Sequence, residues 1–158
     1  MEPVITYRLT GTGVWSYYFY TGQKPLGKVS CALSLLSTVL IETDSFSWHS
    51  TFHADTMVFP GVSRKVIDDQ SDREIFRIVF CEPGFYRLMS AEGSLLIECR
   101  NNAFLFGNPG QPAIAMMERI QECSWIPKGE PFFQTRIYEE NIHDKLLIAM
   151  LAFPAMRF

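Results

Sequence analysis

The stretch that decides the fold is NIHDKLLIAMLAFPAMRF, residues 141–158, which is almost entirely apolar after Lys145. A transmembrane helix needs about 20 apolar residues. The apolar run over 146–156 is shorter than that and contains Pro154, so we do not expect it to span a bilayer. A helix that is apolar on every side is buried on every side. The rest of the chain must therefore surround this segment.

We expect the helix to cover about residues 141–153. Asn141 can cap its N-terminus. Pro154 disfavours helical geometry at Phe153, so the regular helix should end or kink there. His143 belongs to the helix entry rather than to a catalytic site. The side chains expected to be among the most buried are Leu147, Ile148, Leu151 and Phe153.

Length and composition indicate one packed domain over residues 1–158. The chain has 158 residues, of which 47% are hydrophobic and 13 are Phe, and its formal net charge is −3. This mild acidic balance predicts no nucleic-acid partner. The N-terminal sequence shows no basic start followed by a long apolar run, so we expect a cytoplasmic protein without a secretory signal. The cysteines form no C-x-x-C pair, which favours reduced thiols over a disulfide framework or metal site.

Short apolar runs alternate with turn signals between Arg64 and Phe106, as in REIFRIVF, FYRLMS, LLIECR and AFLF. Runs of this length separated by Gly, Pro or Asn predict consecutive antiparallel hairpins. A two-residue turn at Glu92 and Gly93 would pair Leu88 with Ile97. It would also place Ser90 opposite Leu95 and Tyr86 opposite Cys99. The other face carries Arg77, Arg87 and Glu98, where an exposed ion pair of Arg87 with Glu98 is favoured over an anion-binding role.

The hairpins on either side of this one fit the same apolar face. A turn at Asn101 and Asn102 would place Phe104 opposite Cys99 and Phe106 opposite Ile97. A three-residue loop at 82–84 adds Phe76, Ile78 and Phe80 to that face.

Further strands are expected on both sides of this meander. Turns at 11–13 and 22–25 separate three runs near the N-terminus, and PAIAMMERI and PFFQTRIYEE add two strands around a loop containing Trp125, Pro127 and Gly129. Roughly ten to twelve strands over about residues 3–138 are too many for one flat sheet in a small domain. The predicted fold is therefore mainly β, a closed antiparallel barrel around a buried hydrophobic C-terminal helix.

At this point the sequence resembles the tubby C-terminal-like superfamily, which includes the LURP-one-related and phospholipid scramblase-like proteins. The similar stretches are SRKVIDDQSDREIFRI, GFYRLMSAEGSLL, PAIAMMERI and HDKLLIAMLAFPAMRF. The resemblance implies about twelve strands closed around a hydrophobic C-terminal helix. An unrelated barrel or a β-sandwich is the alternative fold.

No motif in the sequence assembles a catalytic or metal site. His49 and His53 lie on an expected strand, where residues four apart are roughly 13 Å from each other, too far for one metal ion. The acidic residues Asp68, Asp69, Asp72 and Glu74 lack the spacing of a calcium loop and predict a solvated hairpin tip. We expect no enzymatic activity and no cofactor.

The resemblance supplies the functional hypothesis. Tubby domains bind phosphoinositide headgroups through basic residues on adjacent strands, and scramblase-like members act at membranes. The candidates here are Lys24, Lys28, Arg64 and Lys65.

The sequence therefore predicts a non-catalytic binding or scaffold domain. It would contact membrane phospholipid headgroups peripherally, or else a protein partner. The alternative is a small-molecule-binding barrel, a carrier or enzyme with its ligand in the interior. The position of the C-terminal helix separates the two hypotheses, because a helix inside the barrel removes the cavity.

Overall fold

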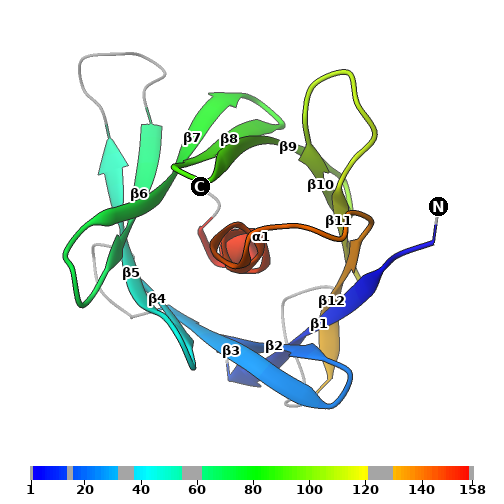
Figure 1. Ribbon diagram of the computed structural model, residues 1–158, viewed down its shortest axis with the longest axis horizontal. Coiled ribbons are helices and arrows are strands. Elements are labelled where there is room, and N and C mark those ends of the chain that lie inside the picture. The colour runs from blue at the N-terminus through cyan, green and yellow to red at the C-terminus, as the bar shows by residue number, and fades with distance from the viewer. Residues whose placement is uncertain (1, 14–15, 32–37, 55–61, 121–129, 157–158) are drawn as a thin grey trace.

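The computed structural model describes residues 2–13, 16–31, 38–54, 62–120 and 130–156, which form a closed antiparallel barrel of twelve strands around one helix. Consecutive strands pair with each other, and β1 pairs with β12 to close the barrel (Figure 1). The predicted fold class is confirmed. The strands are β1 Ile5–Gly13, β2 Ser16–Thr21, β3 Lys24–Cys31, β4 Val39–Thr43, β5 Ser47–Ala54, β6 Val62–Asp68, β7 Glu74–Glu82, β8 Phe85–Ser90, β9 Gly93–Arg100, β10 Ala103–Gly107, β11 Ala115–Arg119 and β12 Pro131–Ile137.

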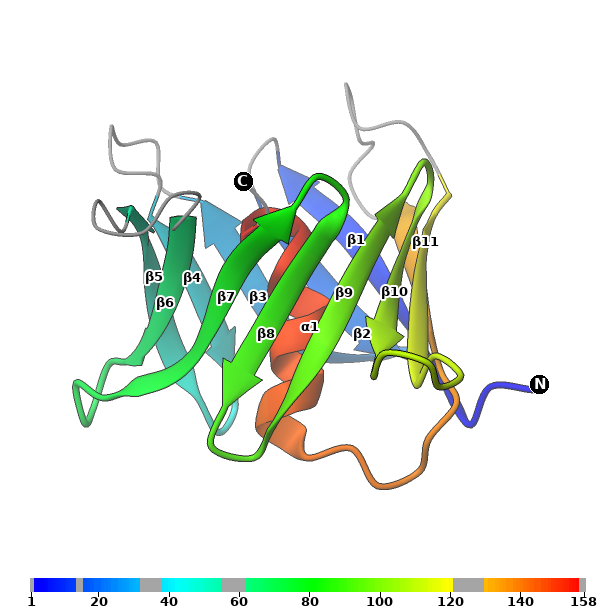
Figure 2. The same ribbon diagram turned by 90° about the horizontal axis from the view of Figure 1, so that it is seen from above.

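The helix α1, Asp144–Met156, lies inside the barrel along its length (Figures 1 and 2). Its middle part, residues 148–153, is apolar on all sides and is surrounded by strands (Figure 1), so water is excluded from it. Leu147, predicted to be among the most buried, is only half-buried because it lies in the first turn. The fully or almost fully buried helix residues are Ile148, Ala149, Met150, Leu151, Ala152, Phe153 and Met156.

Both predicted ends of the helix need correction. The N-terminal cap is His143 rather than Asn141, because its Nδ1 accepts a hydrogen bond from the Lys145 amide and its carbonyl oxygen accepts one from Leu147. The helix also continues through Pro154 to Met156. Proline fixes φ near about −65°, which a helix accepts, and less than one turn of helix follows Pro154, so few helical bonds depend on the geometry after it.

Contacts across the interior join the helix to several strands. The Phe153 ring meets the rings of Tyr86, Phe104 and Phe106 at centroid distances of 5.5, 5.2 and 6.0 Å. The buried Tyr17 hydroxyl on β2 donates to the Leu151 carbonyl oxygen at 3.1 Å. The helix is therefore packed against β8 and β10 and hydrogen-bonded to β2.

The hairpins of the central meander follow the prediction in part. The turn at Asn101 and Asn102 is confirmed, since Phe104 pairs with Cys99. The next turn is Ala91–Glu92 rather than Glu92–Gly93, and Ser90 pairs with Gly93. Gly93 begins β9 instead of completing the turn. Its φ of 140° is one that glycine tolerates and other residues rarely adopt.

The corrected turn shifts the β8–β9 register by two residues. An even shift leaves every side chain on its predicted face, so Leu88 still faces the interior. The exposed pair of Arg87 with Glu98 is wrong, however, because Arg87 faces Leu96. Glu98 instead pairs with Arg100, whose Nε lies 3.1 Å from Oε1.

Glycines near the N-terminus have a different role from the predicted one. Gly11 and Gly13 do not form a turn. They lie at a β-bulge where β1 pairs with β2. Gly27 on β3 lies directly under the Phe19 ring, and a Cβ atom at this position would be 2.3 Å from Phe19 Cζ. Only glycine leaves room for the fully buried Phe19 side chain.

The part of the chain described by the structure contains no helix with the length and hydropathy needed to cross a bilayer. The predicted loop around Trp125, Pro127 and Gly129 lies outside the described residues.

Candidate functional site

Arg64, one of the four predicted headgroup ligands, faces the barrel interior. Its side chain belongs to β6 and is 3% exposed, and its Nε donates to Ser50 Oγ at 2.7 Å. Burial lowers the pKa of the guanidinium, and the nearby Cys31 thiol opposes this effect. A guanidinium buried in this way cannot reach a headgroup at the outer surface, so Arg64 is excluded from the surface considered below.

The three predicted lysines lie on the outside, but on separate parts of the barrel. Lys24 is exposed at the start of β3, and Lys28 further along β3 places its Nζ 5.9 Å from the centre of the Tyr18 ring. Lys65 lies on β6. Strands β4 and β5 separate β3 from β6, and their outward residues include Glu42 opposite Lys28. The structure therefore does not join Lys24 and Lys28 to Lys65 in one site.

Lys65 instead shares the outer face with Arg77 and Arg87, two arginines that the sequence pattern places on this face but that were not among the four predicted headgroup ligands. It pairs directly with Arg77 on β7, and Arg87 on β8 lies opposite Val79, two residues along β7 from Arg77. We call Lys65, Arg77 and Arg87 the outer basic cluster. The sequence favoured an exposed pair of Arg87 with Glu98 over an anion-binding role for these arginines, and the register of β8 with β9 shows that this pair does not form.

The outer basic cluster retains a local positive charge. Arg77 forms an ion pair with Glu74 at 2.9 Å, and no ion pair is recorded for Lys65 or Arg87 within the described residues. Lys65 and Arg77 are like charges directly opposite each other on neighbouring strands, an arrangement that destabilises a sheet. Met89, the cross-strand partner of Arg77, is 46% exposed and adds an apolar side chain at the edge of the cluster.

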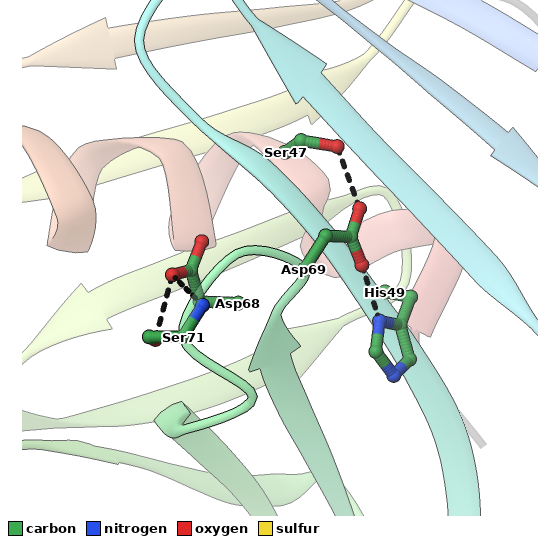
Figure 3. Close-up of polar contacts among 5 residues, drawn as sticks. All are labelled: Ser47, His49, Asp68, Asp69 and Ser71. Atoms are coloured by element: carbon green, nitrogen blue, oxygen red, sulfur yellow. Dashed lines mark hydrogen bonds and ion pairs between the residues drawn. The ribbon is translucent and has the colours of Figure 1, made fainter.

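A second polar group lies at the tip of the β6–β7 hairpin, where Asp69 joins the neighbouring β4–β5 hairpin (Figure 3). Ser47 Oγ donates to Asp69 Oδ2 at 2.6 Å, and His49 Nδ1 donates to Oδ1 at 2.5 Å. The Asp69 amide also donates to the Ser47 carbonyl oxygen. These bonds continue the pairing of β5 with β6, in which Trp48 lies opposite Asp68, as far as the tips of the two hairpins.

This arrangement does not make a nucleophile. In a catalytic triad the serine hydroxyl bonds the imidazole, and the carboxylate orients the imidazole from its other side. Here Ser47 and His49 both bond the Asp69 carboxylate. Side chains of His49 and Asp69 are also 34% and 40% exposed, so water is not excluded from the group.

Asp68 stabilises the turn of this hairpin, and the predicted hairpin tip is confirmed. Asp68 Oδ2 accepts bonds from the Ser71 amide at 3.0 Å and hydroxyl at 2.7 Å, and Asp72 adopts a left-handed φ of 57°. Among the described residues no three His, Cys, Asp or Glu side chains converge as a metal ion requires. His53 lies on β5 as predicted, but its side chain is outside the description.

The contribution of Asp69 to stability should depend on pH. Hydrogen bonds from Ser47 and then from His49 hold the pKa of Asp69 below its ordinary value. Its carboxylate therefore contributes stability that is fully present above the unfolded-state pKa of about 4 and is lost as pH falls through the lower folded-state pKa. Denaturant midpoints of Asp69→Asn and the parent protein should differ at neutral pH and converge in acid.

Ser47→Ala removes the donor of one hydrogen bond to Asp69 and should reproduce part of the loss of stability expected for Asp69→Asn. Both differences are small, since the carboxylate is exposed. A difference between Asp69→Asn and the parent that stays constant from about pH 7 to pH 3 would contradict this account of the hairpin.

Comparison of the sequence and structure with models of protein families, with curated proteins and with solved structures finds no match. The tubby-like resemblance therefore stays a prediction, based on the sequence stretches given above.

Proposed function

We propose that this chain is a non-catalytic, tubby-like binding or scaffold domain that contacts anionic phospholipid headgroups with the outside of its barrel. The supporting observation is the packing of α1 in the interior. Six of its residues, Ala149, Met150, Leu151, Ala152, Phe153 and Met156, are fully buried. A carrier needs a pocket of about 300–1,000 Å³ for its ligand. The helix occupies the space in which such a ligand would lie, so the outer surface is the better candidate.

The outer basic cluster is the part of that surface best suited to a headgroup. Its side chains come from adjacent strands, and attraction to an anionic membrane is worth about 1 kcal/mol for each basic residue near the surface. The neighbouring Met89 can enter the boundary between headgroups and acyl chains. The net charge of −3 makes such a local cluster necessary, because the whole molecule is not attracted to an anionic surface.

Sedimentation with vesicles tests this proposal. Vesicles of phosphatidylcholine alone are compared with vesicles that also contain phosphatidylserine. The double variant Lys65→Gln with Arg87→Gln should weaken binding to the anionic vesicles about 30-fold, since about 1 kcal/mol is lost at each position. Added salt should weaken binding of the parent protein as well.

The matched control is Lys24→Gln with Lys28→Gln, which changes the net charge equally but lies across β4 and β5 from the cluster. Its binding should stay close to that of the parent. An equal loss in both double variants would show that only overall charge matters. No binding of the parent to anionic vesicles would refute the lipid proposal and leave a protein partner as the alternative.

A further inference from the structure

A recess opens at the end of the barrel that the C-terminal part of α1 reaches. The β9–β10 hairpin lies at this end (Figure 2), and the recess has a volume of about 230 Å³. It lies between the barrel rim and the helix, away from the outer basic cluster on β6 to β8. Its lining residues are Arg100, Asn101, Asn102, Ala103, Phe104, Arg119, Phe133 and Pro154.

Two arginines at the mouth of the recess are held in position by neighbours. Arg119 Nη2 donates to Asn102 Oδ1 at 3.2 Å, and the backbone amide of Arg119 donates to the Asn102 carbonyl oxygen at 2.7 Å. Arg100 Nε donates to Glu98 Oε1 at 3.1 Å. Each side-chain bond uses one nitrogen of a guanidinium that carries five N–H donors. Both groups can therefore donate further bonds to an oxyanion.

The floor of the recess is apolar. Phe104 and Phe133 stack at a centroid distance of 5.7 Å and an interplanar angle of 27°, and they are 5% and 7% exposed. Pro154 of α1 completes this side. A site with guanidinium groups at its mouth and rings below suits a molecule that is charged at one end and apolar at the other.

The C-terminal end of α1 gives a second reason for positively charged side chains at this recess. A helix C-terminus carries a partial negative charge, and α1 has no basic residue in its last turn. Arg100 and Arg119 line the same recess as Pro154, so a purely structural role is the competing explanation. In that role they would stabilise the helix end and bind no ligand.

We infer that this recess binds a small organic oxyanion, a carboxylate or phosphate monoester attached to a compact apolar group. The volume is below the range of drug-sized pockets, which limits the ligand to about the size of a benzoate. The arginines bind the oxyanion and the two phenylalanines contact the apolar group. This inference is independent of the proposed lipid contact, because it involves different strands.

Chemical-shift titration of the ¹⁵N-labelled full chain provides the test. The probes are sodium benzoate, phenyl phosphate, inorganic phosphate and the neutral benzyl alcohol. Benzoate and phenyl phosphate should shift the amide signals of Asn102, Ala103 and Arg119 in a saturable way. Inorganic phosphate and benzyl alcohol should each bind at least about tenfold more weakly, because each lacks one of the two parts that the recess contacts.

Substitutions connect the shifts to the arginines. Arg119→Gln should weaken benzoate binding about tenfold or more, since it removes a charge-assisted bond. The control Arg136→Gln removes the same charge from an exposed arginine on β12 that pairs with Glu118 at 3.7 Å, and it should bind benzoate as the parent does. Vesicle binding of Arg119→Gln should be unchanged, which separates a soluble anion from a lipid headgroup.

Several results would overturn the inference. Absence of saturable shifts with both benzoate and phenyl phosphate would show that the recess binds no such anion. Binding of benzyl alcohol as tight as that of benzoate would show that the arginines do not bind the charged group. Equal binding of inorganic and phenyl phosphate would remove the role of the apolar floor. A loss of stability in Arg119→Gln without any effect on benzoate binding would assign the arginines to the helix end alone.

Discussion

A chain that ends at Glu140 is expected to be insoluble or unfolded, because it lacks the helix that fills the barrel. The loss includes the fully buried Met150, Leu151 and Phe153. Natural domains are stable by only about 5–15 kcal/mol, and removing this core exceeds that margin. Far-ultraviolet circular dichroism and a thermal melt of the truncated chain check the result. A soluble truncated chain with a cooperative melt like that of the full chain would show that the barrel does not depend on α1.

Phe153→Ala tests the same packing with one side chain. Replacing a buried phenylalanine by alanine costs about 3–5 kcal/mol, and Phe153 touches rings on β8 and β10. Denaturant unfolding should show a loss in this range. Leu147→Ala is the matched control, since Leu147 is on the same helix but only half-buried, and its loss should be clearly smaller. Equal losses at the two positions would contradict the burial of Phe153.

Gly27→Ala is expected to destabilise the barrel by about 1–3 kcal/mol although it adds a single methyl group. The new Cβ would lie 2.3 Å from Phe19 Cζ and 2.8 Å from the Glu42 carbonyl oxygen. Because Phe19 is fully buried, its ring cannot move into solvent. Each kcal/mol corresponds to a decrease of about 2–4 °C in Tm for a chain of this size, so calorimetry can detect the change.

Phe19→Leu provides the control for this clash. The shorter side chain leaves room for the new methyl group, so the double variant should lose less stability than the sum of the two single variants. Additive losses, or a Gly27→Ala protein as stable as the parent, would show that Phe19 does not lie over Gly27.

The sequence contains enough information for the architecture because two patterns agree. The helix is apolar all round, and the strands that enclose it alternate between apolar and polar residues. The hairpin at Asn101 and Asn102 was predicted with its register because both turn residues favour a tight turn. The hairpin at Gly93 was not, because a glycine can either complete a turn or begin the next strand.

The candidate sites were harder to predict, for different reasons. Arg64 and Lys65 are consecutive on a strand, so they face opposite sides of the sheet and could not both lie on one surface. Alternation alone could have excluded that pair. The bond between His49 and Asp69 depends on the register of β5 with β6, and residues 55–61 connect these strands in place of a two-residue turn that would fix that register. The recess needs side chains from β9, β10, β11, β12 and α1, and a pattern within one segment cannot show such a convergence.

The position of α1 inside the barrel is the claim on which the proposed use of the outer surface rests, and nuclear Overhauser effects test it most directly. With selectively labelled aromatic rings, the Phe153 ring protons should show cross-peaks to Tyr86 on β8 and to Phe104 on β10, whose ring centroids lie 5.5 and 5.2 Å away. Cross-peaks from Phe153 to residues of its own helix alone, with none to either strand, would contradict a helix enclosed by the barrel.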